Sequence, residues 1–250
     1  MTQAINSTRT QCAATWALSG RALRAMLPTL ALVGVIWSVS SWGYYALVNA
    51  MALDSGYDDA PLIFASYYLV WTGIVLLAFR PVFGGQLSRP VLSGHAIALA
   101  PILIAYGVFV AVALPLLPDV SVFRAPPNPP EFMFASAWYY MPKSVEILFQ
   151  QVLVAAMVLR AHRARMPLWA ISILMAVLFG GFHLTLALEG FSPLYVARFT
   201  VAASMFGLVI PWLYLRTSHG FRWAYGLHWG FYALDATVTH LVLAVPKWAM

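Results

Sequence analysis

The chain contains few charged residues. Asp, Glu, Lys and Arg make up 9% of its 250 residues, and only 8 of them are acidic. Soluble domains carry about a quarter charged residues, so this composition excludes an ordinary water-soluble fold. Hydrophobic residues make up 62%, and the mean hydropathy is +0.80. We therefore predict a multi-pass membrane protein whose surroundings are membrane lipid.

Cysteine is almost absent as well. The single residue of this type, Cys12, excludes an intrachain disulfide. The formal net charge of +6 would suggest nucleic-acid binding in a soluble protein. Here the basic residues lie in short clusters between apolar spans, where they indicate membrane topology. We therefore expect no nucleic-acid partner.

The apolar segments have the length of membrane-spanning helices, which need about 20 residues each. The candidate spans are residues 27–50, 61–79, 91–116, 137–160, 167–187, 194–215 and 222–245. This pattern predicts an all-α fold, a polytopic transmembrane helix bundle of about seven spans. Residues 1–26 would form an N-terminal tail, and residues 27–250 a single transmembrane domain.

The connections between the spans alternate in charge. The basic ones contain Arg9, Arg21 and Arg24, then Arg80 and Arg89, then Arg160, Arg163 and Arg165, and finally Arg216 and Arg222. The intervening ones contain Asp54, Asp58 and Asp59, then Asp119, Arg124 and Glu131, and finally Glu189. Basic connections face the cytoplasm. We therefore expect a cytoplasmic N-terminus, with the plasma membrane as the location.

A carboxylate interrupts the apolar run of the fourth candidate span. Lys143, Glu146 and Gln150 are spaced three and four residues apart, so they share one helix face. An ionisable group at membrane depth is costly and is usually functional. The other interpretation is structural, with a Lys143–Glu146 pair and the amide tying helices together.

Two histidines lie in later spans. His183 follows Phe179 and a pair of glycines, and His228 begins a polar stripe that continues with Tyr232 and Asp235. Polar groups of this kind face a bundle interior or a wet cavity, because lipid would leave them unpaired.

Glu146, His183 and His228 thus place one carboxylate and two imidazoles on three helices. Such a set is able to bind zinc and polarise a water molecule. It could equally use the carboxylate as a general base while the imidazoles stabilise an oxyanion. Either chemistry predicts hydrolysis of a peptide bond in a water-poor cavity.

In these motifs, the chain resembles the CPBP intramembrane proteases, a family that includes the type II CAAX prenyl endopeptidases. The family pattern is EExxxR, then FxxxH, then HxxxN or HxxxD, on successive helices. Phe179 to His183 matches the second motif, His228 to Tyr232 resembles the third, and Glu146 to Gln150 resembles the first. The resemblance covers residues 137–240.

The first and third motifs depart from the family pattern. Val145 replaces the first glutamate, Gln150 replaces the arginine, and Tyr232 replaces the Asn or Asp. Two alternatives follow for Glu146. It corresponds to the second, orienting glutamate of the pattern, or the helix turns so that it takes the position of the first. Asp235 lies on the same face as His228 and could replace the missing acceptor at Tyr232.

The resemblance implies an intramembrane peptidase acting on a membrane protein or a lipidated peptide, with Glu146, His183 and His228 as catalytic residues or zinc ligands. Gln150, Phe179, Tyr232 and Asp235 would support them. The alternative is a catalytically inactive relative, a membrane scaffold or a bacteriocin-immunity-type protein, which Val145 and Gln150 favour. A transporter or haem protein is disfavoured, because the chain has no inverted repeat and no second histidine pair in its spans.

The level of His228 in its span sets a geometric condition. Counted at about 1.5 Å per residue from the basic connections, His228 lies less deep than Glu146 and His183. The three residues can meet only if the last helix starts deeper in the bilayer or is strongly tilted.

Overall fold

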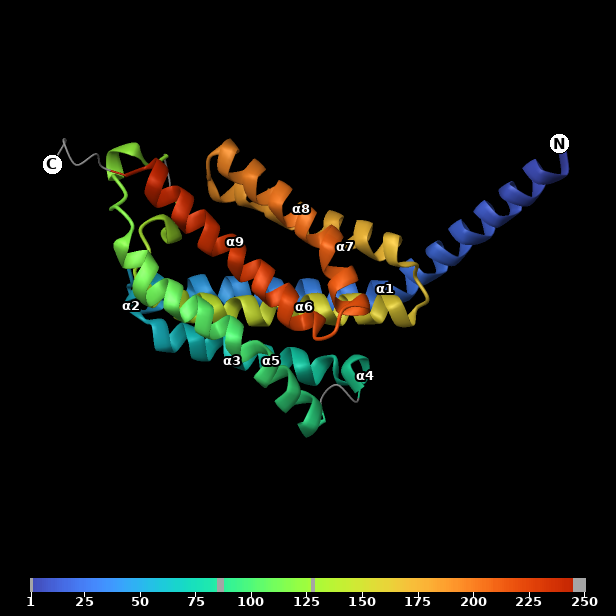
Figure 1. Cartoon of the computed structure of the whole chain (residues 1–250), viewed down its shortest axis with the longest axis horizontal. Coiled ribbons are helices and arrows are strands. Elements are labelled where there is room, and N and C mark those ends of the chain that lie inside the picture. Colours follow the sequence, from blue (N-terminus) through green and yellow to red (C-terminus); the bar gives the residue numbers. More distant parts are fainter. Residues whose placement is uncertain (1, 85–87, 127–128, 245–250) are drawn as a thin grey trace.

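The structure is a computed structural model, and it describes residues 2–84, 88–126 and 129–244. Within these residues the fold is an all-α bundle, as predicted (Figure 1). The helices are α1 (Thr2–Ala50), α2 (Gly56–Asp59), α3 (Pro61–Ala78), α4 (Arg80–Phe83), α5 (Arg89–Val108), α6 (Tyr140–Arg163), α7 (Leu168–His183), α8 (Pro193–Arg216) and α9 (Gly220–Val242). No strand occurs in the described ranges, although an isolated antiparallel bridge joins Val120 and Ala244.

Six helical segments are long and apolar enough to cross a membrane, which confirms a multi-pass membrane protein. They are residues 20–50, 61–78, 90–116, 137–163, 168–189 and 193–216. The seventh candidate, α9, has 23 residues, but its polar stripe lowers its hydropathy and it is not among the six. The span count of seven and the cytoplasmic N-terminus stay predictions.

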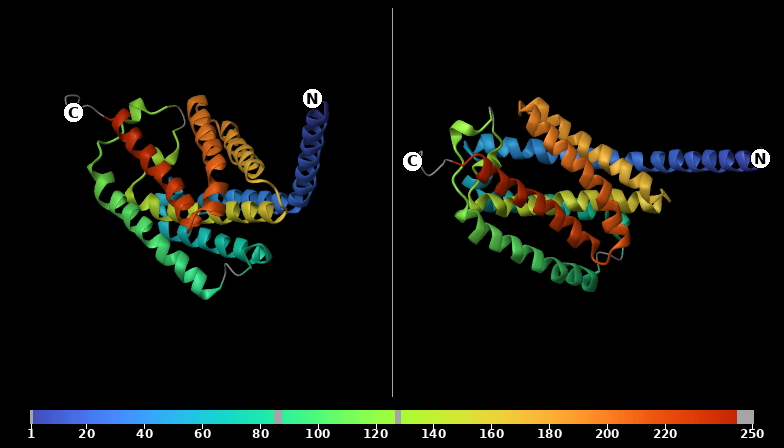
Figure 2. Two further views of the ribbon diagram at one scale, coloured as in Figure 1. Left: turned by 45° about the vertical axis from the view of Figure 1, so that its right-hand side comes forward. Right: turned by 45° about the horizontal axis from the view of Figure 1, so that its top comes forward.

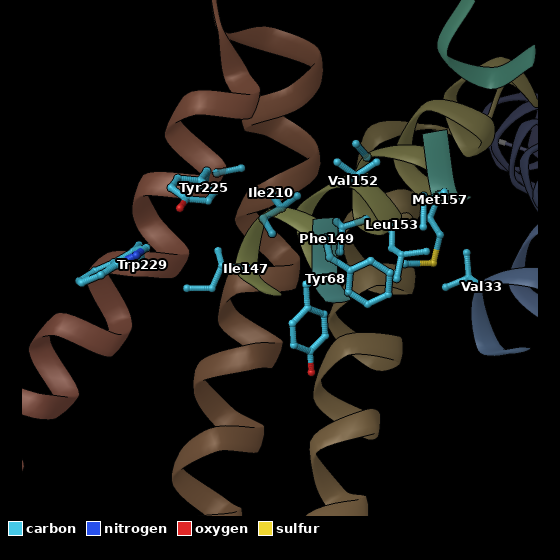
Figure 3. Close-up of a cluster of buried hydrophobic side chains, with 14 of the residues drawn as sticks. Val33, Tyr68, Ile147, Phe149, Val152, Leu153, Met157, Ile210, Tyr225 and Trp229 are labelled. Atoms are coloured by element: carbon cyan, nitrogen blue, oxygen red, sulfur yellow. The ribbon is translucent and has the colours of Figure 1, made fainter. Parts of the chain in front are cut away.

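The helix α6 is the centre of the bundle. In α6, 67% of the apolar window is buried, compared with 11% in the segment that contains α5. It packs against α1, α3, α7 and α9. Figure 3 shows apolar side chains of α6, among them Phe149 and Leu153, beside Tyr68 of α3, Ile210 of α8 and Trp229 of α9. This burial explains why α6 has no clear apolar face in its sequence: neighbours cover it on all sides.

Proline and local breaks set the ends of several helices. Pro61 and Pro193 are the first residues of α3 and α8, where proline has no hydrogen bond to lose. Pro28 lies inside α1, which bends in the left view of Figure 2. In its described residues, the proline-rich connection before α6 contains short 3-10 turns over residues 122–124, 131–133 and 137–139.

The helices α7 and α8 form a close pair that leans away from α9 (Figure 2). Gly207 of α8 allows this approach, because a Cβ atom there would lie 2.6 Å from the backbone of Ala176 in α7. Gly180 of α7 faces Ser204 of α8. Small residues serve this purpose in membrane helices generally.

We expect Gly207→Ala to destabilise the protein by about 1–3 kcal/mol, because the overpacked pair must move apart. Gly181→Ala is the matched control, since no heavy atom lies within 4 Å of a Cβ at that position. The free energy of unfolding in mixed detergent micelles measures both. Equal values for the two variants would contradict this account of the α7–α8 contact.

The last helix is displaced along the bundle. Tyr225, in the second turn of α9, donates a 3.1 Å hydrogen bond to the carbonyl of Ser144, near the start of α6. Trp229 Nε1 donates to the Ser144 hydroxyl at 2.7 Å. The helix α9 is also inclined to α6 and starts short of its end (Figures 1 and 2). The sequence required such a displacement or tilt of the last helix if His228 was to lie as deep in the bundle as His183.

Candidate functional site

Glu146 is the acceptor of three hydrogen bonds. Its Oε2 accepts from Lys143 Nζ at 2.6 Å and from the Tyr57 hydroxyl at 2.9 Å. Its Oε1 accepts from Gln150 Nε2 at 2.8 Å. The side chains of Lys143 and Glu146 are 10% and 15% exposed. The spacing along α6 predicted the two partners on that helix, and the structure brings them together as a structural ion pair would.

Tyr57 reaches this pair from α2, in the connection between the first two spans. Burial raises the pKa of the Tyr57 hydroxyl well above its ordinary value, and the neighbouring Glu146 carboxylate raises it further. Tyr57 therefore keeps its proton at physiological pH and acts as a neutral donor. The connection between the first two spans thereby supplies a hydrogen-bond donor to Glu146.

Lys143 also lies against aromatic rings. Its Nζ is 4.8 Å from the ring centroid of Tyr232, 5.5 Å from that of Tyr57 and 5.8 Å from that of Tyr139. These contacts add cation–π attraction to the ion pair. Because Tyr232 also lines the cavity described next, Lys143 lies on the far side of one of its walls.

A cavity of about 610 Å³ lies between α7, α8 and α9. Its wall is formed mainly by apolar side chains, including Phe199, Phe206 and Leu227. His183, His228 and Tyr232 are its principal polar residues, and Glu146 is not part of its lining. Concave, mostly apolar sites with a few convergent polar groups are typical of ligand pockets.

His183 presents an unprotonated nitrogen at this cavity. Its Nδ1 lies 2.7 Å from the carbonyl oxygen of Phe179. Because a carbonyl oxygen only accepts, Nδ1 carries the proton and Nε2 holds a lone pair. No described residue forms a hydrogen bond with Nε2. His183 is therefore able to accept a proton.

His228 has the opposite proton arrangement. Gln151 Nε2 donates to His228 Nδ1 at 3.0 Å, and Gln151 Oε1 accepts from the Tyr214 hydroxyl at 2.6 Å. In this arrangement the Tyr214 hydroxyl donates to the amide oxygen, and the amide N–H donates to the lone pair at His228 Nδ1. His228 carries its proton on Nε2, which no described side chain contacts through a hydrogen bond. It is therefore a donor.

Both imidazoles pack on the same ring. The centroid of Phe179 lies 5.2 Å from that of His183 and 5.9 Å from that of His228. Tyr232 stacks against His228 at 5.8 Å with an interplanar angle of 25°. The middle motif of the sequence thus brings the two histidines to one place, with Phe179 between them.

We expect Gln151→Leu to release His228 from a single tautomer. Leucine has nearly the same size but cannot donate to Nδ1, and the Tyr214 hydroxyl loses its acceptor on the amide. The ¹⁵N chemical shifts of labelled histidine should change from one defined tautomer to a mixture. Tyr214→Phe should produce a smaller change, because Gln151 keeps its contact with His228. Unchanged shifts in Gln151→Leu would show that the amide does not set the proton position.

The predicted supporting residues have different partners. Gln150 donates a hydrogen bond to Glu146. The carbonyl of Phe179 accepts a hydrogen bond from His183. Asp235 pairs with Arg198 of α8, at 3.0 Å between Oδ1 and Nη2. It does not bond His228, whose Nδ1 is taken by Gln151. In the structure, Asp235 forms an ion pair that links α9 with α8.

A zinc ion does not fit this arrangement. The described part of the chain contains no group of three or more His, Cys, Asp or Glu side chains able to hold a metal. Glu146 would have to coordinate the ion beside the Lys143 ammonium, which is 2.6 Å from its carboxylate. The two cations would repel each other. We therefore assign no step to a metal.

Three polar partners could not be identified from the sequence. Tyr57, Gln151 and Tyr214 come from elements far apart in the chain, and no local spacing relates them to Glu146 or His228. For Gln151 the sequence contains one signal, because it is an amide directly before an apolar run of the fourth candidate span. The structure shows that this amide is fully buried. A buried amide must find partners.

Comparison of the chain with models of protein families, with curated proteins and with solved structures finds no match.

Proposed function

We propose that the chain is an intramembrane peptidase of the CPBP type, which hydrolyses a peptide bond of a membrane-associated or lipidated substrate in the plasma membrane. One observation carries this proposal. His183, with an acceptor nitrogen, and His228, with a donor nitrogen, line the same apolar cavity. Amide hydrolysis needs both functions, a base for the attacking water and a donor for the developing oxyanion.

The reaction follows from the two proton positions. His183 Nε2 takes a proton from water as the water oxygen bonds to the substrate carbonyl carbon. The carbonyl oxygen becomes an oxyanion, which accepts a hydrogen bond from His228 Nε2. The C–N bond then breaks, and His183 Nε2 returns the proton to the leaving amine. The Phe179 carbonyl, bonded to Nδ1, stabilises the positive imidazole in between.

Glu146 has a positioning role in this mechanism. Its carboxylate neutralises Lys143, which lies behind the cavity wall at Tyr232. An uncompensated ammonium there would disfavour protonation of His183. The low-dielectric lining strengthens this repulsion, as it strengthens the oxyanion hydrogen bond.

A second function is favoured by a specific observation. The carboxylate of Glu146 is occupied by Lys143, Tyr57 and Gln150, as in a purely structural ion pair. A non-catalytic relative, acting as a membrane scaffold or a bacteriocin-immunity-type protein, would need no more than this. In that case, Val145→Glu could restore cleavage that the natural chain lacks.

The test is a comparison of protein N-termini in membranes of cells that express the chain. We expect new N-termini in membrane proteins with the natural chain and none with the His183→Gln, His228→Gln double variant. His162→Gln, on the exposed end of α6, is the control and should behave like the natural chain. A farnesylated peptide ending in C-a-a-X tests the lipidated substrate class. Identical N-termini for the natural chain and the double variant would favour the scaffold.

A further inference from the structure

A second hollow lies beside the histidine cavity and faces the surroundings of the bundle. It has a volume of about 510 Å³ and lies on α9 between α5 and α8, which scarcely touch each other. Its lining is apolar and includes Ile102, Leu213 and Trp223. Ala105 and Leu227 in this lining are exposed, so the groove is open to lipid along its length.

The groove adjoins the histidine cavity and shares part of its wall. Tyr106, Val209, Gly226 and Leu227 line both. The Tyr106 hydroxyl is occupied by a 2.6 Å hydrogen bond to the carbonyl of Gly226, so it offers no free donor to a ligand in the groove. An occupant of the groove interior must therefore be apolar.

The mouth of the groove is basic. The guanidinium of Arg222 lies 4.4 Å from the ring centroid of Trp223, which is itself a lining residue. Arg222 Nε is buried and has no hydrogen-bond partner. Arg216, the last residue of α8, and His219, in the turn just before α9, are both exposed. The Arg222 guanidinium thus lies against a ring of the groove lining.

Within the described residues, Arg222 forms no ion pair with an acidic side chain. The 8 acidic residues are Asp54, Asp58, Asp59, Asp119, Glu131, Glu146, Glu189 and Asp235. None lies in the basic connections, and Asp235 is the only one in α9, about 19 Å further along the helix at 1.5 Å per residue. Arg222 is therefore available to an anion from another molecule.

We propose that this groove binds an anionic phospholipid, with an acyl chain along α9 between α5 and α8 and the phosphate on Arg222. An acyl chain suits the apolar lining, and a phosphate suits an unpaired guanidinium. The site is independent of the proposed catalysis.

The test uses the purified full chain in neutral detergent, titrated with phosphatidylglycerol or phosphatidylcholine of the same acyl chains and followed by native mass spectrometry. We expect the natural chain to prefer phosphatidylglycerol. Arg222→Gln should lower that preference about tenfold, because it removes a charge-assisted hydrogen bond to the phosphate. Ala105→Trp, which fills the groove, should weaken binding of both lipids.

Two control variants give the experiment its specificity. Arg160→Gln removes a basic residue of α6 that does not line the groove, and Ala100→Trp adds a ring to an exposed face of α5 outside it. Both should bind like the natural chain. Equal binding of the two lipids by the natural chain would overturn the proposal. So would equal effects of Arg160→Gln and Arg222→Gln, or normal lipid binding by Ala105→Trp.

Discussion

Replacing His183 with alanine is expected to lower the cleavage rate by about 10²–10⁴-fold, the usual contribution of a positioned general base. The variant removes the lone pair at Nε2, and alanine leaves the Phe179 carbonyl without its imidazole partner. His228→Ala should lower the rate by about 10²–10³-fold, because it removes the oxyanion donor. The measurement is the initial rate in proteoliposomes, with a substrate identified from the new N-termini.

The pattern among these variants separates chemistry from folding. The two histidines act in one transition state, so the double variant should be little slower than the slower single variant. His240→Ala is the matched control, since His240 also lies in α9 but bonds the Pro118 carbonyl at 2.9 Å, away from the cavity. A His183→Ala variant that folds and cleaves at the natural rate would remove His183 from the mechanism.

Lys143→Met should destabilise the protein by roughly 3–5 kcal/mol, the cost of removing one partner from a buried ion pair. It leaves the Glu146 carboxylate with two neutral donors, Tyr57 and Gln150, and no cation. The double variant Lys143→Met, Glu146→Gln should recover most of this loss. Its amide can still accept from the Tyr57 hydroxyl, and no buried charge remains.

Reversible unfolding in mixed micelles measures this difference. Arg160→Met is the control, because Arg160 ends the same helix and forms no ion pair within the described ranges. Its free energy of unfolding should stay close to that of the natural chain. If Lys143→Met costs no more than Arg160→Met, the ion pair does not stabilise the bundle.

The parts of the molecule that follow local rules could be predicted from the sequence. The apolar spans became helices, and the spacing of Lys143, Glu146 and Gln150 predicted the contacts of Glu146 with the other two along one face of α6. The polar stripe on α9 correctly placed His228 at an interior cavity, since lipid cannot satisfy such groups.

The long-range partners could not be predicted. Tyr57 lies 89 residues from Glu146, and Gln151 lies 77 residues from His228. Their meeting depends on the reach of the first connection and on the displacement of α9 along α6, neither of which leaves a pattern in the sequence. Asp235 was expected to orient His228 because both share a face. Arg198 of α8 lies nearer to it and carries a full charge.

In the proposed mechanism the histidine pair, rather than the Glu146 cluster, performs the chemistry. The direct measurement is the cleavage rate per folded molecule of the Lys143→Met, Glu146→Gln double variant beside that of His183→Ala. We predict that the double variant stays within about tenfold of the natural chain, because it touches no reacting atom. His183→Ala should be about 10²–10⁴-fold slower. A double variant as inactive as His183→Ala would contradict the claim and make Glu146 the catalytic carboxylate.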